Sequence, residues 1–510
     1  MRDPDRPARP GRALLWRALI AGVLTISLSA TAVASTVLLG VKSFRDNLNK
    51  DGRTVVHIPE ISPADAGSPR TFLILGSDAR YADKKTGAKP RSDTLMLVRV
   101  DPNSKRVAVM SLPRDLKVKI PGVGSDKINA AYADGGPRKT VATVKKLFAD
   151  ATGQPFPING VINVNFGGFR RAVNYVGGVY VDVDRRYYND NTTAKPGEQY
   201  ATIDVQPGYQ KLKGQDALDY VRYRHGDSDF FRASRQQDFL RQISHQSGVR
   251  KLLDFSKRND LARIFGHYFE VDQSFLAPSN LIGLAKTGLF LMGNKAPVNE
   301  VRFPAVESDH PSVDTNLYYT KPGLEQAYRE FMTGAGSASP KAAKSTPDTP
   351  FRNVKRKRNK PSSIAGLEQT TTEGENMAVL ADPKLDFPFY YPTLRKTGSR
   401  YASLQPRLYD IADEQGAKHQ AYRLVLYAGA YGEYYGVQGM TWKAPPILDD
   451  PDGTRTVNGR RLQLYYDGSH LRLVAWRTPK AVYWITNTLT QSIANSRLIA
   501  IAGSLKRLKQ

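Results

Sequence analysis

Cysteine is absent from this sequence of 510 residues, and histidine is scarce. Without cysteine the chain forms no disulfide and offers no thiolate nucleophile, which fits an exported protein that avoids oxidation. The seven histidines show no spacing typical of metal ligands, and His225, inside a charged cluster, is better explained by hydrogen bonding. The chain also lacks a GxSxG elbow, an HExxH motif and a Walker loop. These absences disfavour thiolate, zinc and serine-hydrolase mechanisms.

Acidic residues are the second shortage. The chain has 48 Asp and Glu against 74 Lys and Arg, which gives a formal net charge of +26. Such an excess predicts an anionic partner, namely nucleic acid, anionic lipid or a phosphorylated glycan.

An uncharged, mostly apolar run at 18–41 follows an arginine-rich tail at 1–17. Because about 20 apolar residues span a bilayer, we expect a transmembrane helix here. The tail is more basic than the segment just after the run, which predicts a cytoplasmic tail and a single-pass protein with residues 42–510 outside the cytoplasmic membrane. Ala32-Val33-Ala34 also matches a signal-peptide cleavage site, so a cleaved leader is an alternative. An extracytoplasmic location makes nucleic acid an unexpected partner.

Composition divides the remaining chain into four parts. These are a tether at 42–69, a patterned α/β region at 70–332, a disordered basic linker at 333–376 and a separate small α+β unit at 377–510. In the last unit, alternating strands with turns at Asn458-Gly459, Asp467-Gly468 and Thr478-Pro479 predict an antiparallel meander. An amphipathic helix from about Gln491 to Leu508 closes it. We expect this unit to fold independently and to serve an accessory role in glycan or partner binding.

Strand and turn patterns in the α/β region bring charged residues to one edge. "TFLILG" predicts a buried strand that ends just before Asp78. "DTLMLVRV" and "RVAVMSL" predict two antiparallel strands joined by the turn "DPNSK", and this pairing places Asp93 beside Arg114. "INGVINVN", "FGGFRRAVNYVGG" and "VYVDVD" predict a strand, a helix capped by Asn165 and another strand. The succession predicts layers of helices on a sheet.

Four arginines are concentrated in "VRYRHGDSDFFRASRQQ", residues 221–237. The pattern predicts a short helix ending with Arg222 and Arg224. A second helix follows, on which Arg232, Arg235 and Gln236 share one face. Guanidinium groups fit phosphate oxygens; the alternative is a solvated helix face held by intramolecular ion pairs.

Several motifs, taken in order, resemble the LytR–CpsA–Psr family: "LILGSDAR", "RSDTLMLVRVDP", "VMSLPRDLKV", "KINAAYADGG", "VNFGGFRRAVNYVGGVYVDV" and "LDYVRYRHGDSDFFRASRQQDFL". The resemblance covers about residues 70–245, with looser agreement to about 332. It implies an α/β catalytic domain with a layered mixed sheet flanked by helices. It also implies a membrane-anchored, Mg²⁺-dependent phosphotransferase that attaches a glycopolymer from a polyprenyl-pyrophosphate carrier to peptidoglycan through a phosphodiester. The Arg-, Ala- and Gly-rich composition is typical of an actinobacterial protein.

The resemblance also implies roles for individual residues. Asp78 and Asp93 match the acids associated with Mg²⁺, a cation that prefers one or two carboxylates plus phosphate oxygens. The residues expected to bind the pyrophosphate are Arg91, Arg114, Lys127, Arg222, Arg224, Arg232, Arg235 and Gln236. Arg114 and the other guanidiniums would stabilise the charge that grows during transfer. Asp93 and Asp229 are both open as acceptors of the proton of the attacking sugar hydroxyl.

Two alternatives come from other functional classes. A non-catalytic protein of the cell envelope that binds lipid-linked phosphate or glycan, or regulates its use, would employ the same arginines. The two carboxylates Asp78 and Asp93 disfavour this non-catalytic alternative, since carboxylates near a bound phosphate help binding only if a metal ion lies between them and the phosphate. A DNA-binding regulator is suggested by the positive charge, but the predicted membrane span and the lack of a helix-turn-helix pattern disfavour it.

Overall fold

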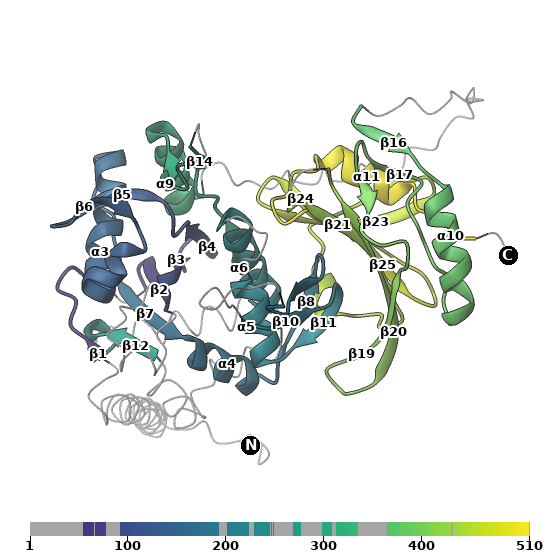
Figure 1. Ribbon diagram of the computed structural model, residues 1–510, viewed down its shortest axis with the longest axis horizontal. Coiled ribbons are helices and arrows are strands. Elements are labelled where there is room, and N and C mark those ends of the chain that lie inside the picture. The colour runs from purple at the N-terminus through teal and green to yellow at the C-terminus, as the bar shows by residue number, and fades with distance from the viewer. Residues whose placement is uncertain are drawn as a thin grey trace, which may run out of the picture.

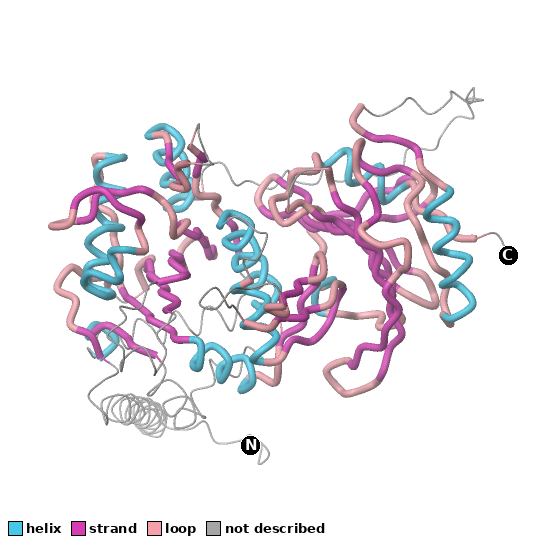
Figure 2. The backbone as a smooth tube through the Cα atoms, in the orientation of Figure 1, coloured by secondary structure: helices cyan, strands magenta, loops and turns pink. Residues whose placement is uncertain are grey.

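The computed structural model describes the chain between residues 55 and 508, with gaps. The described residues are 55–65, 67–77, 92–192, 201–223, 229–244, 246, 248, 269–276, 298–308, 313–334, 365–429 and 432–508. The predicted transmembrane segment at 18–41 lies outside them, as do Asp78, Arg91 and Arg224. None of the helices in these ranges is long and apolar enough to cross a membrane. Figures 1 and 2 show two bodies packed against each other, an N-terminal domain up to residue 334 and a C-terminal domain from residue 365.

A seven-stranded mixed sheet forms the centre of the N-terminal domain. In spatial order its strands are β1 (Val55–Val56), β12 (Phe269–Asp272), β7 (Gly160–Asn165), β2 (Arg70–Ser77), β3 (Ser92–Asp101), β4 (Arg106–Leu112) and β13 (Val298–Glu300). The central strands β2, β3 and β4 are antiparallel neighbours, whereas β7 runs parallel to β2 and β13 parallel to β4. The predicted mixed sheet and its antiparallel strand pair are confirmed.

Helices cover both faces of this sheet. α3 (Ala130–Thr152) and α9 (Lys321–Thr333) pack on one face, where Leu73 joins a large buried apolar cluster. α6 (Asp229–Ser244) lies on the other face, where Met96 belongs to a second cluster. Successive strand residues point to opposite faces, so the apolar strands supply both layers. The domain therefore has the layered α/β architecture that the sequence predicts.

Shorter elements follow the sheet strands in the chain. α4 (Phe166–Tyr175) begins directly after β7, and the predicted cap is confirmed because Asn165 Oδ1 accepts a hydrogen bond from Gly168 N at 2.9 Å. α5 (Gly214–Arg222) precedes α6. Four hairpin-like strand pairs complete the domain: β5 (Lys117–Ile120) with β6 (Gly124–Lys127), β8 (Val179–Val183) with β11 (Gly208–Leu212), β9 (Tyr187–Asn189) with β10 (Ile203–Val205), and β14 (Ala305–Glu307) with β15 (Leu317–Tyr319).

An antiparallel sheet of eight strands dominates the C-terminal domain. In spatial order its strands are β18 (Arg400–Tyr401), β20 (Lys418–Tyr427), β21 (Tyr434–Met440), β25 (Val482–Thr486), β24 (His470–Arg477), β23 (Arg460–Asp467) and β22 (Gly453–Val457), with β19 (Arg407–Ala412) paired to β20. The strand pair β16 (Leu367–Gln369) and β17 (Leu394–Lys396) and the helices α10 (Thr372–Ala381) and α11 (Asn495–Gly503) complete it. The strands β22 to β25 form the predicted meander. Asn458 and Gly459 take positive φ at its first turn, as a tight hairpin requires.

Two predicted boundaries are wrong. The strand β16 and the first half of α10 occupy residues assigned to the linker at 333–376. Arg395 explains the difference, because it pairs with Glu368 and Glu373 at 2.7 Å each and gives this polar segment fixed partners. The closing helix is also shorter than predicted, since the carbonyl of Ile493 accepts a hydrogen bond from Asn487 and is committed to a turn.

The two domains share a buried core, which contradicts the expectation of a fully separate C-terminal unit. Tyr180 and Tyr209 of the N-terminal domain pack with Trp442 and Trp484 in one apolar cluster. Beside them Asp182 pairs with Arg423 at 2.9 Å, and the two side chains are 1% and 0% exposed. These tryptophans fill the domain junction and are not presented for stacking on sugars.

Candidate functional site

A narrow cavity of about 150 Å³ opens beside the starts of β3 and α4 and between α5 and α6. Most of its wall is apolar and is made by Ile74, Leu75, Met96, Val164, Phe166, Phe169, Leu218, Val221, Phe239 and Leu240. The remaining side chains are polar and include Asp93, Arg222, Arg232 and Gln236. The cavity therefore combines an apolar wall with charged side chains from three different elements.

Asp93 lines the cavity and pairs with Arg114. Arg114 Nη1 lies 2.6 Å from Asp93 Oδ1, which confirms the predicted juxtaposition. The antiparallel register causes it, because Leu95 opposes Leu112 and both charged residues lie just beyond that pair. Arg232, only 4% exposed, reaches the same Asp93 oxygen at 4.0 Å. Two guanidiniums thus face one carboxylate at the cavity.

A chain of charges extends this pair toward the β5–β6 hairpin. Arg114 Nε lies 3.5 Å from Asp115 Oδ2, and Lys127 Nζ lies 3.0 Å from Asp115 Oδ1. Lys127 also donates a hydrogen bond to Thr315 Oγ1 at 3.2 Å. Lys127 is thus connected to Asp93 through Asp115 and Arg114. Asp115 is missing from the predicted site, although its position after Arg114 in "SLPRD" is the signal that would have found it.

Arg222 reaches the cavity from the last turn of α5. Its Nε and Nη2 lie 3.1 and 3.0 Å from Asp219 Oδ1, one turn earlier on the same helix. Gln215 also donates to both oxygens of Asp219. Tyr223 leaves the helix with φ −51° and ψ 133°, so α5 ends at Arg222, before the predicted last turn that was to include Arg224. Asp219, which the sequence did not single out, fixes the direction of this guanidinium.

Gln236 connects α6 to two neighbouring elements. Its Nε2 donates to Thr94 Oγ1 at 3.0 Å and to the carbonyl of Val221 at 3.1 Å. These bonds join α6 to the start of β3 and to the end of α5. Gln236 is therefore at the place where the predicted motifs meet.

Arg235 lies elsewhere, which corrects the expectation that it binds pyrophosphate. Its side chain is 0% exposed and packs on the rings of Tyr187, Tyr220 and Tyr223, with centroid distances of 4.6, 5.8 and 5.8 Å. It also donates to the carbonyl of Tyr223. Positions three apart on a helix differ by about 60° in direction, which is enough to place Arg232 and Arg235 in different layers.

Metal binding at this site depends on the acids. Among the described residues no group of three or more His, Asp or Glu side chains is arranged to hold a metal ion. Asp78 lies outside the described residues, and for Asp229 only the backbone, at the start of α6, is described. Both arginine contacts of Asp93 fall on Oδ1. The donor set fits Mg²⁺ if phosphate oxygens, water and a second carboxylate complete the shell, because Mg²⁺ prefers such ligands.

Comparison with known proteins gives consistent matches. In Bacillus cereus (strain AH820), the polyisoprenyl-teichoic acid–peptidoglycan teichoic acid transferase TagU is 35% identical over 316 residues, covering 61% of this chain and 93% of the relative. TagT of Bacillus subtilis (strain 168), which bears the same transferase name, is 30% identical over 268 residues, covering 51% of this chain and 78% of the relative.

Solved structures of the same group also align. TagT bound to LI-WTA is 28% identical with a TM-score of 0.40, covering 54% of this chain and 97% of that one. A TagT structure with bound octaprenyl pyrophosphate lipid is 26% identical with a TM-score of 0.37, with the same coverage of both chains. A sequence model of the LytR_cpsA_psr family matches residues 35–330, which is more than half of the chain. The motifs around Asp93, Arg114 and Arg232 lie within this range, and the chain belongs to the LytR_cpsA_psr family.

Proposed function

We propose that this protein transfers a phosphate-linked glycopolymer from a polyprenyl-pyrophosphate carrier to peptidoglycan. The names of its relatives support this activity, since TagU and TagT are polyisoprenyl-teichoic acid–peptidoglycan teichoic acid transferases. The cavity supports the class of substrate. A polyprenyl pyrophosphate has a long apolar chain and a compact anionic head, and the cavity lining likewise combines apolar side chains with charged ones.

The observation that carries the proposal is that charged side chains and an apolar wall line the same cavity. Phe166, Phe169 and Phe239 offer apolar surface suited to an isoprenoid chain, where each buried CH₂ group contributes about 0.8 kcal/mol. Arg222 and Arg232 line the same cavity and suit the pyrophosphate. An intramolecular ion-pair network needs no apolar cavity beside it, so the cavity favours ligand binding.

The chain's own residues supply positioning and charge stabilisation. A hydroxyl oxygen of peptidoglycan attacks the phosphorus attached to the glycopolymer, a new P–O bond forms, and the bond to the polyprenyl phosphate breaks. Arg114, Arg222 and Arg232 hold the phosphate oxygens in line and stabilise their growing charge. Mg²⁺, when bound by Asp93 together with Asp78, supplies further charge neutralisation.

The hydroxyl proton needs an acceptor. Asp93 is held by Arg114 at 2.6 Å and faces Arg232 at 4.0 Å, so its carboxylate is engaged in binding and charge balance. Asp229, at the N-terminal end of the helix that carries Arg232, is the other candidate. We assign the role of general base to Asp229.

The location of the protein follows from the same proposal. A polyprenyl carrier resides in the membrane, and peptidoglycan lies outside it. An anchor at 18–41 with a cytoplasmic tail at 1–17 would hold the cavity at the outer surface of the cytoplasmic membrane.

A transfer assay tests the proposed function. Full-length protein is incubated with a labelled, polyprenyl-pyrophosphate-linked glycopolymer and peptidoglycan, and label retained on washed peptidoglycan is counted. Arg114→Lys should lose most of the transfer, because lysine cannot reproduce the fork that holds Asp93 and phosphate together. Arg138→Lys is the matched control, since Arg138 is 61% exposed and pairs only at the surface with Glu60. Unaltered transfer by Arg114→Lys, or an inactive parent protein that binds the lipid, would refute the assignment as a transferase.

A further inference from the structure

The helix α6 contacts the cavity with one side and the C-terminal domain with the other. Arg232 and Gln236 line the cavity, and Arg241 lies in the last turn. Nine positions separate Arg232 from Arg241, so at about 100° per residue the two side chains point in roughly opposite directions. Residues that bind Arg241 therefore fix α6 from the side opposite to the cavity and to Arg232.

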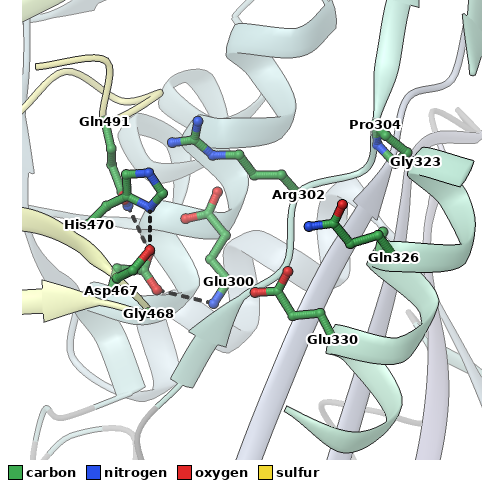
Figure 3. A pocket seen from close by; sticks show the side chains of 12 residues that line it. Glu300, Arg302, Pro304, Gly323, Gln326, Glu330, Asp467, Gly468, His470 and Gln491 are labelled. Carbon is green, nitrogen blue, oxygen red and sulfur yellow. Dashed lines mark hydrogen bonds between the residues drawn. The ribbon is translucent and has the colours of Figure 1, made fainter. Parts of the chain in front are cut away.

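Arg241 is held by a buried cluster of carboxyl groups from three elements. Its guanidinium bonds Asp238 on α6, and it lies 3.2 Å from Glu300 Oε2 on β13. It also bonds Asp467 Oδ2, at the end of β23 in the C-terminal domain. Asp467, 2% exposed, further accepts hydrogen bonds from Glu300 N at 3.2 Å and Gln491 Nε2 at 2.8 Å, which Figure 3 shows at the wall of a cavity between the domains.

The charges in this cluster depend on one another. Burial and the charge of Asp467 raise the pKa of Glu300 to about 8. Burial also opposes ionisation of Asp467, but Arg241 and the bond from Glu300 N outweigh it and hold the pKa of Asp467 below its ordinary value. Removing one partner of a buried ion pair leaves an uncompensated charge, which costs more than a surface pair does. The Asp467 carboxylate is therefore a strong constraint on Arg241.

The C-terminal domain also contacts the other end of α6. Gly432, with φ +73°, approaches Phe231 so closely that a Cβ atom there would lie 2.5 Å from the ring. Phe231 immediately precedes Arg232 in the chain. Arg185 stacks nearby on the rings of Tyr187 and Tyr434, one from each domain, at 4.4 and 5.3 Å. The helix is thus contacted by the C-terminal domain near both of its ends.

We propose that Asp467 is a positioning residue for ligand binding: through Arg241 it fixes α6 so that Arg232 and Gln236 face Asp93 across the cavity. This inference rests on the proposed function, because it takes the ligand to be a polyprenyl pyrophosphate. It gives the C-terminal domain a role in the chemistry of the N-terminal domain without any contact with the substrate.

Affinity measurements on the full-length protein test the inference. Asp467→Asn keeps the side-chain size but removes the charge that holds Arg241. We expect it to weaken polyprenyl-pyrophosphate binding by about tenfold or more, since small displacements of binding groups have large effects. In protein that already carries Arg232→Lys, adding Asp467→Asn should lower the affinity little further, because both substitutions act on the contact of residue 232 with the ligand. Purely structural damage would instead add to the effect of Arg232→Lys.

A matched control lies in the same domain junction. Tyr409 donates a hydrogen bond to the carbonyl of Tyr209 at 2.9 Å, and neither residue belongs to α6. Tyr409→Phe should lower the melting temperature without changing the affinity. If Asp467→Asn does not fold, Gly432→Ala displaces the other end of α6 and should show the same dependence on Arg232.

The outcomes separate the two proposals. Unchanged affinity in Asp467→Asn, or a loss that adds to that of Arg232→Lys, would overturn the positioning role while the proposed function stands. If Arg232→Lys alone leaves the affinity unchanged, the assigned binding site itself is wrong and the positioning role fails with it.

Discussion

Replacing Arg232 by lysine keeps the positive charge but removes the planar fork that binds two phosphate oxygens at once. Arg232 is 4% exposed and lies 4.0 Å from Asp93 Oδ1, at the polar part of the cavity. On a solvated surface such a replacement changes little, because exposed ion pairs contribute about 0–1 kcal/mol. At a buried anion site it removes charge-assisted hydrogen bonds. The two interpretations of this arginine cluster therefore predict different results.

The size of the effect follows from the contacts that are lost. A hydrogen bond to a charged group contributes about 1.5–3 kcal/mol. Since 1.4 kcal/mol corresponds to a factor of ten, Arg232→Lys should raise the Kd for a polyprenyl pyrophosphate by about 10- to 100-fold. The effect on affinity for the corresponding polyprenyl alcohol should be small, because that ligand has no phosphate.

Isothermal titration of full-length protein with both lipids in detergent measures the two affinities. Arg138→Lys is the control, because Arg138 is 61% exposed and pairs with Glu60 at 3.3 Å, away from the cavity. Melting temperatures show whether either variant is damaged. An unchanged pyrophosphate affinity in Arg232→Lys, or an equal loss in Arg138→Lys, would refute the assigned role of the cavity.

Three other expectations are open to direct measurement. Asp93→Ala should abolish Mg²⁺-dependent transfer while the protein stays folded; normal transfer at saturating Mg²⁺ would contradict the metal assignment. Glu300 has its pKa raised to about 8, by burial first and then by Asp467, while Arg241 opposes the shift. Because the carboxyl pKa is higher in the folded protein, it adds stability below the unfolded value of 4.5, and this added stability is lost as the pH rises toward 8. The melting temperature of Glu300→Gln should therefore fall less over this pH range than that of the parent protein. A reporter fused after Gln510 should be active only outside the cytoplasm, and cytoplasmic activity would exclude the predicted orientation.

Local patterns predicted the parts of the site that are close in the sequence. The turn between two alternating strands was enough to place Asp93 beside Arg114, because an antiparallel register fixes which residues oppose each other. The cap of α4 at Asn165 was also predicted from local residue types, whereas α5 ends two residues earlier than predicted, at Arg222. Geometry of this kind depends on a few neighbouring residues and can be read from the chain.

Environment was harder to predict than position. Arg232 and Arg235 lie on the same helix, three residues apart, but one faces the cavity and the other is packed among tyrosines. Helical periodicity alone does not distinguish them, because it says nothing about which layers enclose α6. The apolar lining of the cavity was also missed, since residues such as Phe169 and Phe239 look like ordinary core positions in the sequence.

The contacts of α6 with the C-terminal domain were beyond any local pattern. Arg241 and Asp467 are 226 positions apart, and the linker between their domains contains no signal for the pairing. Asp467 looked like a turn residue before Gly468, which it also is. Its second role arises only because the C-terminal domain packs on the N-terminal one with a shared core. A truncation after residue 334 would therefore expose that core and also release Arg241. Loss of activity in the truncated protein would not reveal a substrate contact of the C-terminal domain. The single substitution of Asp467 releases Arg241 without exposing the core, and so separates these two causes.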